Sequence, residues 1–226
     1  MYIWGSQTLN LQLRRLAAVL LSLSLLLPIA GATAESPDVL LSGVAKQMTT
    51  ALNANREQLS QDPVQLNQLV SDILLPHMDF ISASKWVLGK HWSDASRAQK
   101  KQFILEFRTL LVRFYATALS EYLAKNEVRE ETIRILPLRA PPEENSVTVR
   151  SEVYPPSGQP IPVLYHMHLR RDRWRIYDVS VDGVSMVSTY RTSFDTEIRE
   201  RGLHGLIASL AERNQELLKK AKTTVN

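Results

Sequence analysis

The hydrophobic pattern of this chain changes its period near Glu130, and this change sets the fold class. Before it, from Ser36 to about Leu123, apolar residues recur at the three- and four-residue spacing of helices. After it, β-branched and aromatic residues alternate with a period of two. The segments with this pattern cover residues 131–138, 145–154, 161–169 and 173–182. The sequence therefore predicts an α+β chain, with helices first and a sheet after them.

The connections between the four predicted strands decide how the strands pair. Residues 139–144, 155–160 and 170–172 join them, and each connection is too short to contain a crossover helix. Neighbouring strands must therefore run antiparallel. We predict a curved four-stranded antiparallel meander.

Capping residues place the boundaries of the predicted helices in region 36–123. Asp62 and Asp79 are predicted N-caps, and the short helix after Asp79 is expected to end at Gly89. The helix after Ser96 carries a wide apolar stripe, which must meet apolar protein or ligand over a large arc. Further helices, expected to cover the sheet, fill region 186–220 and are predicted at residues 186–201 and 204–220.

The first 34 residues have the three parts of a secretory signal. Two arginines precede an apolar run, residues 16–27, that is shorter than the roughly 20 residues needed to span a bilayer. Small residues at 32–34 suit a signal peptidase, so cleavage is expected after Ala34; an uncleaved anchor is the alternative. Residues 35–226, which number 226 minus 34, or 192, are predicted to form a single domain.

Composition excludes several classes of protein. The chain has no cysteine, so it has no lipid-modified cysteine, disulfide or thiolate metal site. Its formal charge of +4 falls to +2 when the two signal arginines leave, which is too little to indicate nucleic-acid binding. No later apolar run reaches membrane-spanning length, so the exported protein is predicted to be soluble.

Residues 183–187, GVSMV, approach the G-x-S-x-G elbow of serine hydrolases. That elbow needs a parallel sheet and a second glycine, whereas this strand is predicted to be antiparallel and Val187 occupies the glycine position. Asp195, the next acidic residue, falls inside the same predicted helix as the serine. We therefore predict that Ser185 caps the helix that begins at Met186 and is not a nucleophile.

Four segments carry a family resemblance. The strongest is WRIYDVSVDGVSMVSTYRTSF, residues 174–194, with W-x-x-x-D-V, G-V-S and Y-R-x-x-F patterns. The others, at 74–80, 88–119 and 201–210, occur in the family's order, and together they span nearly all of the chain after Ala34. The chain resembles the MlaC family, also called the toluene-tolerance auxiliary family.

The resemblance implies a soluble periplasmic carrier that shuttles glycerophospholipids between the outer and inner membranes and so maintains outer-membrane lipid asymmetry. It implies two docking partners, an outer-membrane lipoprotein complex and an inner-membrane ABC transporter with its membrane-anchored lipid-binding subunit. The implied fold is the cone of nuclear transport factor-like proteins with added helices. A monomer is expected, with no enzymatic activity, metal or cofactor, and with phospholipid as the cargo.

A lipid carrier needs an apolar cavity and no specific sequence motif, because each methylene group of the lipid that is buried contributes roughly 0.8 kcal/mol to the free energy of binding. Candidate residues for the cavity lining are the alternate apolar positions of the predicted strands and the wide apolar stripe of the long helix. For each of these residues, ordinary core packing is the alternative. The predicted lining residues are Val147, Val149, Val153, Val163, Tyr165 and Met167 on the strands, and Phe107, Leu111 and Phe114 on the long helix.

The head group of the cargo is a phosphodiester, which a cation or a helix N-terminus at the cavity mouth favours. We place Tyr190 and Arg191 near this mouth because they follow the predicted helix start at Met186. The alternative pairs Arg191 with Asp195 at i, i+4 and keeps Tyr190 in the core.

Two other functions stay open at this stage. An enzyme on the same cone-shaped fold would use Tyr165, His166, His168 and Asp178 on adjacent predicted strands. However, the two histidines face away from Tyr165, no carboxylate is placed beside either by the sequence pattern, and a zinc site would lack a recognisable third ligand. The second alternative is an interaction protein that bridges envelope proteins without a ligand.

Overall fold

The computed structural model describes residues 35–139 and 145–223. The predicted signal segment lies outside the described residues, so cleavage after Ala34 and the single domain that follows it stay predictions. In the part of the chain that the structure describes, no helix has both the length and the apolar character to cross a membrane.

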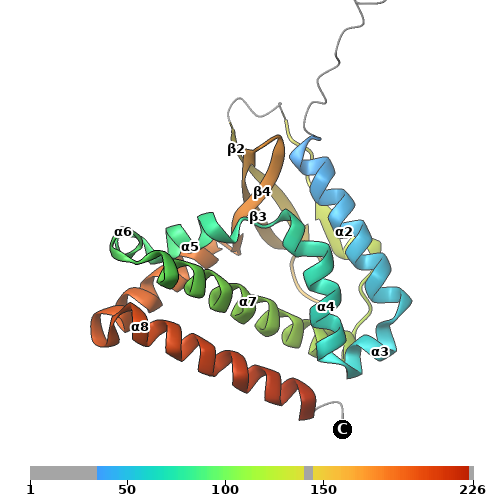
Figure 1. Cartoon of the computed structure of the whole chain (residues 1–226). Helices are drawn as coiled ribbons and strands as arrows, with labels where there is room; N and C mark the ends of the chain where they lie inside the picture. The colour runs from blue at the N-terminus through green and yellow to red at the C-terminus, as the bar shows by residue number, and fades with distance from the viewer. Residues whose placement is uncertain (1–34, 140–144, 224–226) are drawn as a thin grey trace, which may run out of the picture. The chain divides into compact units, whose positions relative to one another are not determined.

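Helices form the first part of the described chain (Figure 1). They are α2 (Pro37–Ala54), α3 (Arg56–Gln61), α4 (Pro63–Leu74), η1 (Leu75–His77), α5 (Phe80–Leu88), α6 (His91–Asp94), α7 (Arg97–Lys125) and η2 (Glu130–Thr132). The Asp62 carboxylate accepts hydrogen bonds from the N–H groups of Val64 and Gln65 at 3.0 and 2.9 Å. Ser96 and Gln99 form a reciprocal capping box at the start of α7. These contacts confirm two predicted helix starts.

The strands form one antiparallel sheet in sequence order. They are β1 (Ile133–Ile135), β2 (Ser146–Val153), β3 (Ile161–Arg170), β4 (Arg173–Val181) and β5 (Val184–Ser185). The α+β class and the antiparallel meander are confirmed, but the predicted number of four strands is wrong, because the described residues form a sheet of five. Positive φ angles at Asp182 and Gly183 turn the chain so tightly that Val184 and Ser185 pair back onto β4.

The last helix, α8 (Met186–Thr223), begins at the residue predicted for it. Gly202 interrupts it with a φ of 70° and a ψ of 169°, so α8 consists of two helices, as the sequence predicts. It packs along α7 and against α5 (Figure 1).

Over residues 35–139 and 145–223, buried apolar side chains form three clusters. One joins α5, α7 and α8 around Phe103, Phe107 and Phe194. A second joins α2, α3, α4 and α7. The third lies on the sheet, where Leu41 of α2 packs with Val149 and other strand residues. The sheet is therefore covered by α2, whereas α7 contributes to the two helical clusters.

Candidate functional site

One face of the sheet carries mostly apolar side chains. The β2–β3 register places Val147 opposite Met167, Val149 opposite Tyr165, and Val153 opposite Ile161. Directly paired residues point to the same side of a sheet, and so do residues two apart on a strand. The six predicted strand residues therefore share one face, which we call the inner face.

The inner face is only partly buried. Val149 and Met167 are fully buried, with 0% exposure, and Val163 is buried as well. Val147, Val153 and Tyr165 are half-buried. Burial raises the pKa of the Tyr165 phenol, although a hydrogen bond with Ser151 opposes this. The inner face thus combines a packed centre with apolar surface that remains accessible.

The three predicted lining residues of α7 do not lie in the sheet cluster. Phe107 packs in the helical cluster, with its ring centroid 5.6 Å from that of Phe103 and 5.9 Å from that of Phe194. Leu111 belongs to the same cluster. Phe114 is 51% exposed and contacts the ring of Tyr115. Their role as lipid-lining residues stays a prediction.

Tyr190 and Arg191, the predicted mouth residues, lie at the junction of α8 with α5 and α7. Tyr190 is half-buried against Phe107, and burial raises the pKa of its phenol. The Arg191 Nε donates to the Trp86 carbonyl oxygen at 2.7 Å, and the guanidinium lies 5.8 Å from the Trp86 ring centroid.

The alternative that pairs Arg191 with Asp195 is wrong. Asp195 instead lies 2.7 Å from the Nε2 atom of His91 and 3.5 Å from the Nζ atom of Lys90, and also contacts Arg199.

Ser185 acts as a helix cap. Its Oγ accepts a hydrogen bond from the N–H of Ser188 at 3.0 Å and donates one to Asp178 Oδ2 at 2.6 Å. Asp178 Oδ1 also accepts from the N–H of Val187 at 3.0 Å. The structure therefore confirms the predicted cap and adds Asp178 as its partner, which the sequence analysis had not assigned.

His168 has a carboxylate beside it that the sequence analysis missed. Its Nε2 atom lies 2.8 Å from Asp79 Oδ2, and Asp79 also caps α5 by accepting from the Ser82 N–H at 2.9 Å. Burial by itself would raise the pKa of Asp79, but the hydrogen bonds from Ser82 and His168 outweigh it and lower that pKa. Within the described residues, no group of three or more acidic, histidine or cysteine side chains is arranged to hold a metal.

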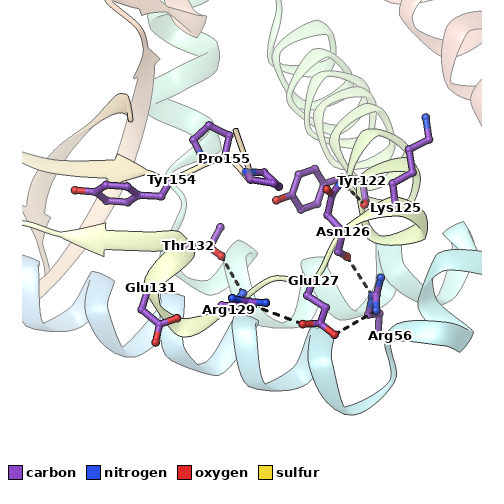
Figure 2. A pocket seen from close by; sticks show the side chains of 11 residues that line it. Arg56, Tyr122, Lys125, Asn126, Glu127, Arg129, Glu131, Thr132, Tyr154 and Pro155 are labelled. Atoms are coloured by element: carbon purple, nitrogen blue, oxygen red, sulfur yellow. Dashed lines mark hydrogen bonds and ion pairs between the residues drawn. The ribbon is translucent and has the colours of Figure 1, made fainter. Parts of the chain in front are cut away.

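A first hollow, which we call the tyrosine hollow, lies between the end of α7 and the ends of β1 and β2. Its volume is about 870 Å³, within the range of small-molecule sites. Figure 2 shows Tyr122 and Pro155 among the side chains that line it, and Glu127 lies between Arg56 and Arg129 with N–O distances of 3.6 and 3.8 Å. The lining residues are Arg56, Tyr122, Lys125, Asn126, Glu127, Arg129, Glu131, Thr132, Tyr154, Pro155 and Pro156.

A second hollow, which we call the arginine hollow, lies between the β3–β4 hairpin, α5 and α7. Its volume is about 970 Å³. It is lined by Leu75, Met78, Asp79, Phe80, Ile81, Ile104, Arg108, Arg170, Arg171, Arg173 and Arg175. None of the predicted site residues lines either hollow. The arginine-rich run RRDRWR, residues 170–175, is the sequence signal that could have indicated the arginine hollow.

A family model described as MlaC protein matches residues 42–212 of this chain. The chain belongs to the MlaC family. The match extends from within α2 to within the second half of α8, so it includes the sheet and both hollows. The resemblance carried by the four sequence segments is confirmed.

Proteins similar to this MlaC-family chain include two relatives of known name. The intermembrane phospholipid transport system binding protein MlaC of Haemophilus influenzae is 26% identical over 181 residues, which are 78% of this chain and 81% of the relative. The toluene tolerance protein ttg2D of Pseudomonas putida is 27% identical over 191 residues, 84% of each chain.

A solved structure is also similar, that of a phospholipid-binding protein from Ralstonia solanacearum in complex with a phospholipid. The TM-score is 0.71 at 26% identity, and the match covers 81% of this chain and 99% of that chain. The MlaC-family chain therefore shares the fold of a protein that has been observed with a lipid.

Proposed function

We propose that this MlaC-family protein carries glycerophospholipids as the soluble binding component of a phospholipid transport system. The observation that carries the proposal is the similar Ralstonia solanacearum protein, which holds a phospholipid and nearly all of whose chain is matched here. The Haemophilus influenzae relative is named for intermembrane phospholipid transport, which supports the same role.

The inner face of the sheet supports this proposal physically. A carrier must bury two acyl chains, and each methylene moved out of water contributes roughly 0.8 kcal/mol. Val147, Val153 and Tyr165 leave apolar surface accessible on this face, although their neighbours Val149 and Met167 are fully buried. Such a surface binds acyl chains without a specific polar contact.

The location and partners of the protein belong to the same proposal. The protein is exported to the periplasm, its signal is cleaved after Ala34, and it works as a monomer. It receives and delivers lipid at an outer-membrane lipoprotein complex and at an inner-membrane ABC transporter with its membrane-anchored subunit. This traffic maintains the lipid asymmetry of the outer membrane. The name of the Haemophilus influenzae relative supports the transport system as a whole.

The carrier role involves no catalytic residue. Two of the side chains that suggested chemistry in the sequence are engaged structurally, Ser185 in the cap with Asp178 and His168 in the contact with Asp79. Both contacts fix secondary-structure elements relative to one another, which favours a structural role for these groups.

Native mass spectrometry of the protein purified gently from cells tests the proposal. We expect a mass increment that matches phospholipid, and lipid analysis of a denatured portion of the same sample identifies it. A clean lipid-free mass would contradict the proposal and favour the ligand-free bridging protein.

A further inference from the structure

The arginine hollow collects positive charge from distant parts of the chain. Arg170, Arg171, Arg173 and Arg175 come from the β3–β4 hairpin, and Arg108 comes from α7. The fold therefore brings five guanidinium groups around one hollow of about 970 Å³. Like charges repel one another, so this arrangement favours an anion within the hollow.

Protein groups satisfy only part of this charge. Asp79 is the one carboxylate among the lining residues, and it already accepts hydrogen bonds from Ser82, His168 and Arg170. Arg175 donates to the Pro76 carbonyl oxygen. The side chains of the other three arginines, Arg108, Arg171 and Arg173, form no hydrogen bond or ion pair within the described residues.

Free guanidinium groups that converge on a hollow suit phosphate. The planar guanidinium donates two parallel hydrogen bonds to phosphate oxygens, and these charge-assisted bonds are stronger than neutral ones. The sign of the charge and the chemistry of the guanidinium donors thus point to a phosphate group.

The hollow also has an apolar wall, which a free phosphate ion would leave unused. Leu75, Met78, Phe80, Ile81 and Ile104 line it, and Ile81 is 58% exposed. A ligand that fills both parts must join a phosphate to apolar material.

An apolar stripe on α7 leads from the arginine hollow to the tyrosine hollow. Its residues recur at helical spacing within an arc of about 80°. The apolar members are Ile104, Val112, Tyr115, Leu119 and Tyr122, and Arg108 lies between the first two. None of the six is fully buried, and Val112, Leu119 and Tyr122 pack partly against the second helical cluster. From residue 104 to residue 122 the helix rises about 27 Å, whereas the acyl chains of one bilayer leaflet span about 15 Å. The stripe is therefore long enough to accompany an acyl chain.

We propose that the arginine hollow binds the phosphate of a phospholipid head group, with an acyl chain directed along the α7 stripe. This inference rests on the proposed function. It places the head group at Arg108, Arg171 and Arg173, rather than beside Tyr190 and Arg191.

Calorimetric titration of the lipid-stripped protein with dihexanoyl phosphatidylglycerol, kept below its micelle concentration, tests the inference. We expect the double variant Arg108→Gln/Arg173→Gln to bind at least tenfold more weakly than the unmodified protein. The matched control is Arg134→Gln/Arg150→Gln, which removes two exposed arginines from β1 and β2, and it should bind within twofold. Equal thermal unfolding of the three proteins verifies their folding.

Two further titrations identify the source of the phosphate. Dihexanoylglycerol, which lacks phosphate, should bind the unmodified protein and the double variant equally. Inorganic phosphate should bind the unmodified protein at least tenfold more weakly than the phospholipid; phosphate binding as tight as the lipid would overturn the assignment to a head group.

The outcomes separate the inference from the function on which it rests. Equal phospholipid binding by the unmodified protein and the double variant overturns the arginine site and leaves the carrier function in place. Absence of phospholipid binding by the unmodified protein overturns the carrier function itself.

Discussion

Asp178 joins the last long strand to the last helix through one carboxylate. It accepts hydrogen bonds from the N–H of Val179 at 2.8 Å, from Ser185 Oγ at 2.6 Å and from the N–H of Val187 at 3.0 Å. Its negative charge at the start of α8 also complements the helix dipole. The GVS motif thus fixes the β4–α8 corner.

Truncation of this corner should affect stability more than lipid binding. We expect Ser185→Ala to lower the free energy of unfolding by about 1 kcal/mol, the usual loss for a helix cap. Asp178→Ala should lower it by about 3 kcal/mol, because a charged acceptor and several donors lose their partners. Chemical denaturation measures both values, and native mass spectrometry should find phospholipid in both proteins. Equal losses of stability would contradict the role of Asp178 as the anchor.

Asp79 predicts a pH dependence of stability. Its pKa is lowered from the ordinary value of 3.8, so its contribution is present above that value and is lost as the pH falls through the lower pKa of the folded state. We expect Asp79→Asn to be less stable than the unmodified protein at pH 7, with a difference that narrows below about pH 3.8.

Thermal unfolding at several pH values measures this difference. Asparagine still caps a helix, so Asp79→Asn removes mainly the charge. Asp62→Asn is the matched control, because Asp62 caps α4 through the backbone N–H groups of Val64 and Gln65. A difference for Asp79→Asn that stays constant across the acidic range would exclude the charged contact with His168 as its cause.

The β3–β4 hairpin has a turn that its residues do not favour. Arg171 and Asp172 have φ angles of 48° and 58°, the left-handed pair of a type I′ turn, in which glycine is preferred at the second position. We expect Asp172→Gly to raise the free energy of unfolding by about 0.5 kcal/mol, because glycine adopts this conformation without steric cost. Chemical denaturation measures the change. Asp172→Ala serves as the comparison and should be less stable than the unmodified protein, and the opposite order would contradict the turn assignment.

The two faces of β2 should respond differently to the same charge. Val147 lies half-buried on the inner face, and its neighbour Thr148 is exposed on the other face. We expect Val147→Glu to lose copurifying phospholipid, because a carboxylate on the inner face makes burial of an acyl chain unfavourable. Thr148→Glu is the control and should retain it. The measurement is the lipid-to-protein ratio of folded protein, and retention in both variants would contradict the inner face as the cavity wall.

The sequence predicts most elements because their signals are local. Asp79 and Gly89 bound α5, and Ser96 starts α7, through caps that involve residues at most a few positions away. β5 escaped prediction because two residues, Val184 and Ser185, cannot display a period. Their pairing depends on the preceding turn, which brings them back beside β4.

At the level of the whole molecule, bound phospholipid should stabilise the fold. A ligand that binds only the folded state at a hundred times its Kd adds about 2.7 kcal/mol. For a chain of this size each kcal/mol shifts Tm by about 2–4 °C, so removal of the lipid should lower Tm by roughly 5–10 °C. Differential scanning calorimetry before and after lipid extraction measures the shift, and added phospholipid should restore it. An unchanged Tm would favour the bridging protein.

The amino-acid sequence by itself determined the α+β class, the antiparallel pairing, the family and the caps that start α4, α5 and α7. Each of these depends on periodicity, short connections or contacts within a few residues, which operate before distant segments meet. Only the tertiary structure decided what each face meets. Periodicity defines an apolar face on α7 but does not determine which element covers that face. In the structure Phe107 of this face packs against Phe194 of α8. Likewise Asp79 meets His168 across 89 residues, and Arg108 joins the hairpin arginines, because folding alone brings these segments together.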